Sequence, residues 1–518
     1  MTTASPSRRF VLAGAAGAAG AAAVTTVAAP AEAAYVPRTW TGGPALLPAA
    51  ERHLVTRFSG GLTPALATEV RNAGGGRAWF ERQLEPGSID DSAVTAIDTW
   101  WPDLARDPAT LWQRQIGNVR GGWEVMADYQ RWVLMRRMRS RRQVLETMTA
   151  FWENHFNVTA NGDNAFVHRV GYGQTIRKHA LGRFADLLRA AATHPAMLIY
   201  LDNAISTKAH PNENLGRELL ELHTVGRGNY DEDDVKDSAR ILTGWRVDVR
   251  NTWDPFYSAP DHWTGAVSVM GFSDANAVAD GRALTERYLD YLARHPATAR
   301  RVAGRLAVKF VQDDPPSSLV DRLAAAYLAA DTDIAAVLRE LVATPEFAAA
   351  RGRKVRDAFE DLVATHRALG VSLQAPTGPN SAANAMLWKA NKMGGMPLAW
   401  PRPDGHPIAD AAWCSSSRVL ASLELHWEMS GGYWPKQDIR YRAGTSWLPQ
   451  RRMRFDVLVD ALSRRLLHRP STSVLLQACC EALDLTPGTI ITRTHRAVTY
   501  DNARLLTTFL DSPAFLSR

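Results

Sequence analysis

Apolar side chains recur every three or four residues along most of this chain, and that spacing limits the folds open to it. It predicts amphipathic helices, whose apolar stripes must be buried against one another. Strand-like alternation is confined to 266–270 and 489–492. The sequence therefore predicts a mainly α protein with at most a minor β element, built as a single large multi-helical domain or as two closely packed helical lobes. The predicted helices are 49–58, 64–72, 77–84, 110–116, 123–138, 141–156, 182–193, 195–201, 212–226, 231–243, 280–295, 297–312, 316–329, 333–343, 353–369, 414–428, 453–466, 470–483 and 500–510.

Changes in composition divide the helical chain into three parts. Helical spacing holds through 35–369, which carries the candidate site residues, and it returns in 413–518, the C-terminal helical part of the same domain. Between them, 370–412 is rich in Pro, Gly and Trp and contains the sequence Trp-Pro-Arg-Pro-Asp-Gly-His-Pro. A loop of that length inside a compact chain is usually functional or mobile.

The first 34 residues have the features of an export signal. Arg8 and Arg9 precede Phe10, an Ala- and Gly-rich apolar run follows, and Ala31-Glu32-Ala33 forms a small-x-small cleavage site. The paired arginines are typical of the twin-arginine pathway. We expect 1–34 to be a twin-arginine signal peptide and the protein to be secreted or associated with the cell envelope. No later stretch reaches 18 uninterrupted apolar residues, so no transmembrane span is expected.

Charge and cysteine content narrow the classes of partner. The net charge of +7 comes from scattered arginines without a basic run that could follow a phosphate backbone, so nucleic-acid binding is not expected. The 17 tryptophans favour packing in a helical core, and they also suit a cleft that binds sugar or aromatic rings. Cys414 could form a disulfide with Cys479 or Cys480, or all three could be free thiols.

The segment 212–226, NENLGRELLELHTVG, is the strongest candidate for a site. On a helical wheel Asn214, Arg217, Glu218 and Glu221 share one face, and Glu213, Arg217 and Glu221 follow one another at intervals of four. That spacing predicts a ladder of ion pairs on a solvated face, which needs no chemistry. The ladder leaves Glu218 without its arginine, and His223 falls among the leucines.

Two further clusters combine histidine with tryptophan. In 151–156, FWENHF, His155 is a better candidate for a general base or metal ligand than Glu153, because residues two apart on a helix point in different directions. In the aromatic segment 245–271, His262 lies between Asp261 and Trp263. The spacings typical of zinc proteases, di-iron proteins, serine hydrolases and nucleotide-binding loops are absent.

Taken together, these segments resemble the DUF1800 family, a bacterial domain of unknown function often found on exported proteins. The resemblance runs from Glu51-Arg52-His53-Leu54 through FWENHF, NEN with RELLELHT, and Leu242-Thr243-Gly244-Trp245 to Pro403-Asp404-Gly405. His262, Gly265 and Gly271 fit a further family pattern, but Val267 stands where that pattern has a lysine. The resemblance implies an architecture and candidate positions but no reaction. Members often occur beside another exported family that resembles sulfatases and phosphatases, which associates them with extracellular polymers.

Two functions follow as hypotheses. The first is an exported hydrolase or lyase acting on an extracellular or cell-wall glycan. The second is a non-enzymatic exported scaffold or assembly partner that contacts another exported protein through 370–412 or a tryptophan surface. In the enzyme, the candidate acid, base or proton-carrying groups are Glu218, Glu221, His155, His223 and His262, and the candidate substrate-binding residues are Arg217, Asn214, Trp152, Trp245 and Trp263. A divalent metal such as zinc or iron would be held by residues from the set His155, Glu218, His223 and His262.

Overall fold

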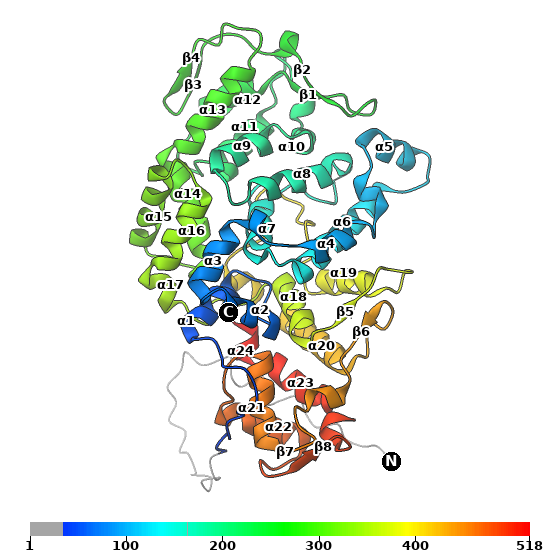
Figure 1. Cartoon of the computed structure of the whole chain (residues 1–518). Coiled ribbons are helices and arrows are strands. Elements are labelled where there is room, and N and C mark those ends of the chain that lie inside the picture. Colours follow the sequence, from blue (N-terminus) through cyan, green and yellow to red (C-terminus); the bar gives the residue numbers. More distant parts are fainter. Residues whose placement is uncertain (1–34, 163) are drawn as a thin grey trace, which may run out of the picture.

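The computed structural model describes residues 35–162 and 164–518, and they form a mainly α-helical protein, as predicted (Figure 1). The predicted signal peptide, 1–34, lies outside the described residues. Within them, no helix is both long and apolar enough to cross a membrane.

Buried apolar side chains form two large clusters. The first contains helices from the N-terminal two thirds of the chain. These helices are α1 (Ala49–Arg57), α2 (Pro64–Asn72), α3 (Gly76–Leu84), α7 (Gln143–His155), α8 (Phe166–His179), α9 (Phe184–Ala192), α10 (Pro195–Tyr200), α11 (Glu213–Glu218), α12 (Glu232–Leu242), α13 (Arg282–Arg294), α14 (Pro296–Phe310), α15 (Ser317–Ala329), α16 (Ile334–Ala343) and α17 (Pro345–Ala349).

The second cluster combines the C-terminal helices with two helices from earlier in the chain. Its helices are α4 (Ser92–Asp98), α6 (Gly122–Arg139), α18 (Ala358–Leu369), α19 (Ala382–Lys392), α20 (Ser416–Gly431), α21 (Phe455–Leu466), α22 (Ser473–Leu483), α23 (Asn502–Leu510) and α24 (Pro513–Leu516). A small third cluster joins α5 (Pro108–Ile116) to the first half of α6. The long helix α6 therefore contributes to both the second and the third cluster, and it lies beside α4 in Figure 1.

The β-structure is limited to four antiparallel two-stranded ribbons within the described residues. The pairs β1 (Trp245–Val247) with β2 (Pro255–Tyr257), and β3 (Val267–Val269) with β4 (Phe272–Asp274), lie at one end of the molecule. The other two pairs join distant parts of the chain: β5 (Ser372–Leu373) with β6 (Ile439–Arg440), and β7 (Arg452–Arg454) with β8 (Ile490–Thr492). The strand-like segments expected at 266–270 and 489–492 are thus β3 and β8.

Local sequence signals account for many helix boundaries. Thr63 caps α2 by accepting a hydrogen bond from the Leu66 N–H, and Pro64 follows at the first helical position. Asp231, the first residue of the predicted helix 231–243, caps α12 by accepting from the N–H groups of Asp233 and Asp234. These polar groups satisfy backbone donors that a helix cannot pair internally.

Five helices depart from the sequence-based expectation. The periodicity does not indicate α4, α8, α17 or α24, and the segment 370–412, expected to be a loop, contains α19. In α8 the apolar spacing is broken by Gly171 and Gly173 and by a basic last turn. Tertiary packing overrides the weak local preference of such segments.

A buried polar triad joins three elements of the second cluster. His426 on α20 contacts Asp361 on α18 through Nε2 (3.1 Å) and Asp511, just after α23, through Nδ1 (2.8 Å). Burial alone would lower the pKa of His426, but the charge of Asp361 and hydrogen bonds to both carboxylates raise it to about 9. The same contacts hold the pKa of Asp361 down at about 2, against the effect of its burial.

The three cysteines are free. Cys414 is exposed, whereas Cys479 and Cys480 are buried in the second cluster. The disulfide considered for Cys414 is therefore not formed.

Candidate functional site

The C-terminal end of α7 fixes the segment 400–406 through two asparagines. Asn154 Nδ2 donates to the carbonyl oxygen of His406 (2.9 Å), and the His406 N–H donates to Asn154 Oδ1 (2.5 Å). Asn157 Nδ2 donates to the carbonyl oxygens of Trp400 (3.0 Å) and Arg402 (2.7 Å). The FWENHF motif thus anchors a segment that lies 252 residues further along the chain.

Gly405 is required at this contact. Its φ is +73°, a left-handed conformation that other residues rarely adopt, and a Cβ there would collide with the carbonyl oxygen of Asn154. The neighbouring Asp404 is exposed. Its Oδ1 accepts from Trp400 Nε1 (2.8 Å), and its Oδ2 pairs with Arg402 (3.1 Å).

The candidate helix 212–226 is not a uniform α-helix. It begins as α11 and continues from Leu219 to His223 as one π-helical turn, labelled η6. Side chains from outside the turn satisfy two of its last carbonyl oxygens: Arg301 Nε donates to that of Leu222 (2.9 Å), and His155 Nε2 contacts that of His223 (3.0 Å). Such single π turns are frequent at functional sites.

The wider turn changes the expected ion-pair ladder. Arg217 pairs with Glu213 (3.4 Å), as predicted, but its second partner is Glu232 on α12 (2.7 Å). Glu221 pairs instead with Arg227 Nε (2.5 Å) and accepts a hydrogen bond from Tyr230 Oη (2.7 Å). The predicted Arg217–Glu221 rung is therefore wrong, because the π turn moves Glu221 off the spacing of an α-helix.

Glu218 is the carboxylate on this face that remains without a partner. It is half-buried, and neither a hydrogen bond nor an ion pair to a described residue engages it. Burial, together with the charges of Glu221 and Asp404, raises its pKa above the ordinary glutamate value. The segment anchored by Asn154 thus brings Asp404 close enough to act on Glu218.

Two other polar side chains surround this carboxylate pair. Tyr200 Oη donates to the carbonyl oxygen of Pro401 (3.0 Å), and burial with the charges of Glu218 and Asp404 raises its pKa to about 12. The charge of Asp404 tends to raise the pKa of Arg305 on α14. Burial and the charge of Arg301 outweigh this effect and lower that pKa to about 10. The Nε and Nη2 of Arg305 are buried with no hydrogen-bond partner among the described residues.

His155 and His223 are core residues. Their ring centroids are 6.2 Å apart, and each ring also packs on Phe156. Burial and the charges of Arg301 and Arg305 lower the pKa of His223 to about 3, and burial lowers that of His155 well below its usual value. Both are at most 2% exposed, so neither lies where a substrate arrives from solvent in this conformation.

His262 lies apart from these groups. Its Nδ1 contacts the carbonyl oxygen of Thr243 (2.9 Å), and its Nε2 contacts Asn276 Oδ1 (2.9 Å), so both ring nitrogens are engaged. Trp263 lies under Arg240, whose Cζ is 4.7 Å from the ring centroid, and Trp245 Nε1 donates to Thr285 (3.1 Å). These contacts fasten the β1–β4 region to α12 and α13.

The remaining predicted residues also make structural contacts. Trp152 is fully buried, and its Nε1 donates to the carbonyl oxygen of Ala180 (3.0 Å). Asn214 is exposed near the start of α11 and donates to Asp202 Oδ2 (3.3 Å). Of the proposed ligand contacts, Arg217 and Asn214 are the two on the accessible face with Glu218.

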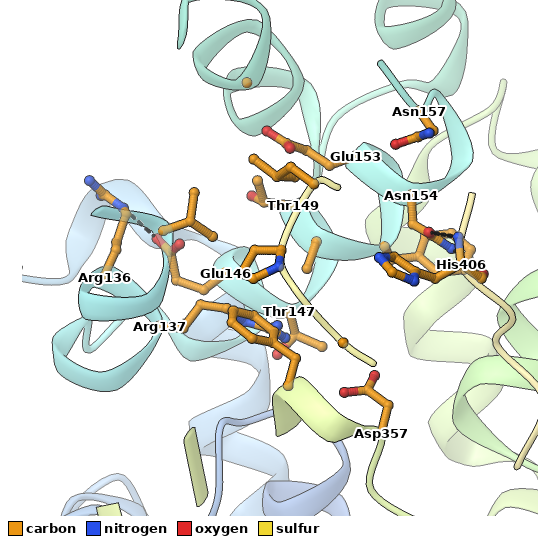
Figure 2. A pocket seen from close by; sticks show the side chains of 18 of the residues that line it. Arg136, Arg137, Glu146, Thr147, Thr149, Glu153, Asn154, Asn157, Asp357 and His406 are labelled. Atoms are coloured by element: carbon orange, nitrogen blue, oxygen red, sulfur yellow. Dashed lines mark hydrogen bonds and ion pairs between the residues drawn. The ribbon is translucent and has the colours of Figure 1, made fainter. Parts of the chain in front are cut away.

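A large pocket opens on the other side of the anchored segment, between the two apolar clusters (Figure 2). Residues of α6, α7, α8, α14, the start of α18 and the segment 395–413 line it, and its volume is about 120 Å³. His406 faces this pocket, whereas Asp404, two residues earlier, acts on Glu218. None of the sequence-predicted site residues lines it.

Two carboxylates from α7 reach the pocket, and both are engaged by arginines. Glu146 Oε1 accepts from Arg136 Nε (2.9 Å) and Arg177 Nη2 (2.8 Å). Glu153 Oε2 accepts from the fully buried Arg169 (2.7 Å), and its Oε1 accepts from Tyr129 Oη (3.2 Å). About two helical turns of α7 separate Glu146 from Glu153, and both are labelled in Figure 2.

The candidate metal ligands do not form one set. Among residues 35–162 and 164–518, no three His, Cys, Asp or Glu side chains are grouped so that they could hold a metal ion. The rings of His155 and His223 are neighbours, whereas both ring nitrogens of His262 contact Thr243 and Asn276 instead.

The fold and these contacts define a mainly α-helical protein in which Glu218 of α11 and Asp404 of an anchored loop interact, with a separate pocket lined by α6, α7 and the segment 395–413. The chain belongs to the DUF1800 family of proteins of unknown function, whose family model matches residues 53–517. No curated protein and no solved structure matches it.

Sequence-based prediction overlooked Glu146, Glu153 and Arg137 as pocket residues. Glu153 was noted in FWENHF but ranked below His155, although the helix turns Glu153 towards the pocket and His155 towards the core. A usable signal was the spacing of Glu146, Thr149, Ala150, Glu153 and Asn157, which lines one face of α7 and its continuation.

Proposed function

We propose that this protein is a hydrolase or lyase that cleaves an extracellular or cell-wall glycan, with Glu218 as general acid and Asp404 as general base. In either reaction Glu218 gives its proton to the departing glycosidic oxygen. In hydrolysis Asp404 removes a proton from the attacking water, and in elimination it removes a proton from the sugar carbon. Two carboxyl groups with different environments suit this division of roles.

The observation that carries the proposal is the unpaired state of Glu218. The other acidic side chains of the helix, Glu213 and Glu221, hold basic partners, whereas Glu218 is half-buried beside a second carboxylate. A buried carboxyl without a partner lowers stability, which proteins tolerate chiefly where the group has a function. The raised pKa of Glu218 favours the protonated form that a general acid needs.

Neighbouring groups supply binding functions. The positive charge of Arg305, which interacts with the negative charge of Asp404, favours binding of an anionic substrate group near this loop. The ring of Tyr200, whose Oη donates to the Pro401 carbonyl oxygen, offers aromatic surface against which a sugar ring can pack, whereas the ring of Trp400 already contacts Arg402 and His406. These features support a saccharide more than a peptide or nucleic acid.

Export belongs to the same proposal. The arginine pair and cleavage-site pattern of residues 1–34 support transport by the twin-arginine pathway to the cell envelope or the medium. Replacing Arg8 and Arg9 by lysine is expected to retain the protein in the cytoplasm, measured by fractionation. Secretion that continues unchanged would contradict this assignment.

The reaction is tested with a panel of cell-wall and extracellular polysaccharides. New reducing ends without an unsaturated product indicate a hydrolase, and new ultraviolet absorbance from a carbon–carbon double bond indicates a lyase. Glu218→Gln and Asp404→Asn should each abolish the product that the wild-type protein forms. The matched control is Glu213→Gln on the same helix, which should keep the activity, because Arg217 retains Glu232.

A second candidate function, an assembly partner without enzymatic activity, is favoured by an exposed aromatic surface. Trp388 on α19 is 54% exposed, and its ring centroid is 5.6 Å from that of Trp434. Binding of an exported protein there predicts that Trp388→Ala abolishes co-purification of that partner, whereas Glu218→Gln leaves it unchanged. Glycan cleavage that is lost in Glu218→Gln would support the enzyme and contradict an assembly partner without enzymatic activity.

A further inference from the structure

We propose that the large pocket between the two apolar clusters binds a small organic carboxylate with a ring-shaped or flat apolar part, and that Arg137 holds the carboxylate group. This inference does not depend on the proposed reaction, because other residues carry it. Figure 2 shows Arg137 entering the pocket from α6, with Asp357 entering from the start of α18.

Arg137 differs from the other basic residues of the pocket. Its guanidinium Cζ lies 4.5 Å from the ring centroid of Phe359, and neither a hydrogen bond nor an ion pair to a described residue engages it. Burial lowers its pKa, and the charges of Asp357, Glu360 and Glu146 oppose that effect. A guanidinium in this position still carries its charge at neutral pH, and its donors are free for a ligand.

The other charged side chains near Arg137 already have partners within the protein. Arg136 and Arg177 share Glu146, and Lys309 bonds to Glu360 Oε1 (2.8 Å). Asp357 Oδ1 caps α18 by accepting from the Glu360 N–H (2.7 Å). Among these basic side chains, Arg137 is therefore the one whose N–H donors have no partner among the described residues.

The charge balance favours a monoanion. Four basic side chains line the pocket, Arg136, Arg137, Arg177 and Lys309, against three acidic ones, Glu146, Glu153 and Asp357, which leaves a net charge of +1. A dianionic phosphate would bring a second negative charge next to those carboxylates. A carboxylate matches the planar guanidinium and adds only one charge.

The rest of the lining fits a ring. Phe151, Phe359, Trp132 and Trp413 supply aromatic surface against which a flat ring can pack. Concave sites lined mainly by aromatic groups, with a few polar groups that fix orientation, are typical of small-molecule binding.

Calorimetric titration of the purified full chain tests the inference with defined probes. The probes are glucuronate and benzoate, their neutral counterparts glucose and benzyl alcohol, and inorganic phosphate. The wild-type protein should bind at least one of the carboxylates more tightly than its neutral counterpart and more tightly than phosphate. Arg137→Met, which keeps an unbranched stem over Phe359, should weaken carboxylate binding at least tenfold.

The matched control is Arg139→Met. Arg139 lies on the same helix and over the ring of Trp100 (4.9 Å), but it is outside the pocket. This variant should bind as the wild type does. If Arg137→Met does not fold, the comparison of charged and neutral probes on the wild-type protein still tests whether the pocket prefers a carboxylate.

Four outcomes would overturn the inference. They are wild-type protein that binds neither carboxylate, equal affinity for charged and neutral probes, stronger binding of phosphate than of both carboxylates, and equal loss of affinity in the Arg137 and Arg139 variants.

Discussion

The buried triad of His426, Asp361 and Asp511 predicts a specific dependence of stability on pH. His426 is completely buried between the two carboxylates, so removing its proton takes away the positive charge between two acidic groups and leaves a single ring N–H, which can donate to only one of them. The raised pKa means that the folded state binds this proton more tightly than the unfolded state, where histidine titrates near 6.5. The contribution of His426 to stability is therefore complete below about pH 6.5 and is lost as the pH rises through about 9.

The magnitude follows from the shift in pKa. One pKa unit corresponds to about 1.4 kcal/mol. A rise from 6.5 to about 9 therefore gives a contribution on the order of 3 kcal/mol to the free energy of unfolding. That is a large fraction of the stability of an ordinary domain.

The assay compares urea unfolding of the wild-type protein and of His426→Gln between about pH 6 and pH 10. The glutamine cannot titrate, so the difference between the two proteins reports His426 together with the two carboxylates whose pKa values it lowers. The wild type should be more stable at the acidic end, and the difference should shrink by about 3 kcal/mol towards the alkaline end. A difference that stays constant over this range, or that grows with pH, would refute the reasoning.

Three further substitutions test the supports of the site by urea unfolding. Asn154→Ala removes both hydrogen bonds to the His406 backbone and should cost about 1–3 kcal/mol; a loss below a few tenths would show that the anchor is dispensable. Gly173→Ala places a Cβ against Tyr129 Oη and Glu153 Oε1 and should cost about 1–3 kcal/mol, whereas Gly171→Ala on the same helix has open space and should gain about 0.5–1 kcal/mol; equal effects would contradict the packing argument. Arg169→Met leaves Glu153 buried without its ion pair and should cost about 3–5 kcal/mol at neutral pH; a milder effect would mean that Tyr129 alone satisfies the carboxylate.

Local sequence signals were sufficient for most of the helices but not for α8. The caps at Thr63 and Asp231 mark helix starts through bonds to residues two or three positions away, so the sequence alone contains both partners. In α8, Gly173 weakens the helical pattern because Tyr129 and Glu153 approach its backbone too closely for a side chain. That constraint comes from α6 and α7 and is invisible in the segment itself.

The candidate site was predictable only where it depends on residues that are close together in the sequence. The helical wheel singled out Glu218 as the carboxylate without an arginine, and the structure agrees. Its neighbour Asp404 lies far away in sequence and is placed by Asn154 and Asn157, contacts that no local pattern contains. The π turn, which sends Glu221 to Arg227, also lies beyond an argument that assumes regular α-helical spacing.

The central claim is that Glu218 provides acid catalysis, and the rate of the Glu218→Gln variant tests it most directly. The measurement is the initial rate of glycan cleavage by wild type, Glu218→Gln and Glu213→Gln at equal folded concentration, with thermal unfolding as the check on folding. The account predicts that Glu218→Gln loses about 10²–10⁴-fold in rate with its unfolding temperature kept or raised, while Glu213→Gln stays close to wild type. A Glu218→Gln variant that cleaves at the wild-type rate would contradict the account.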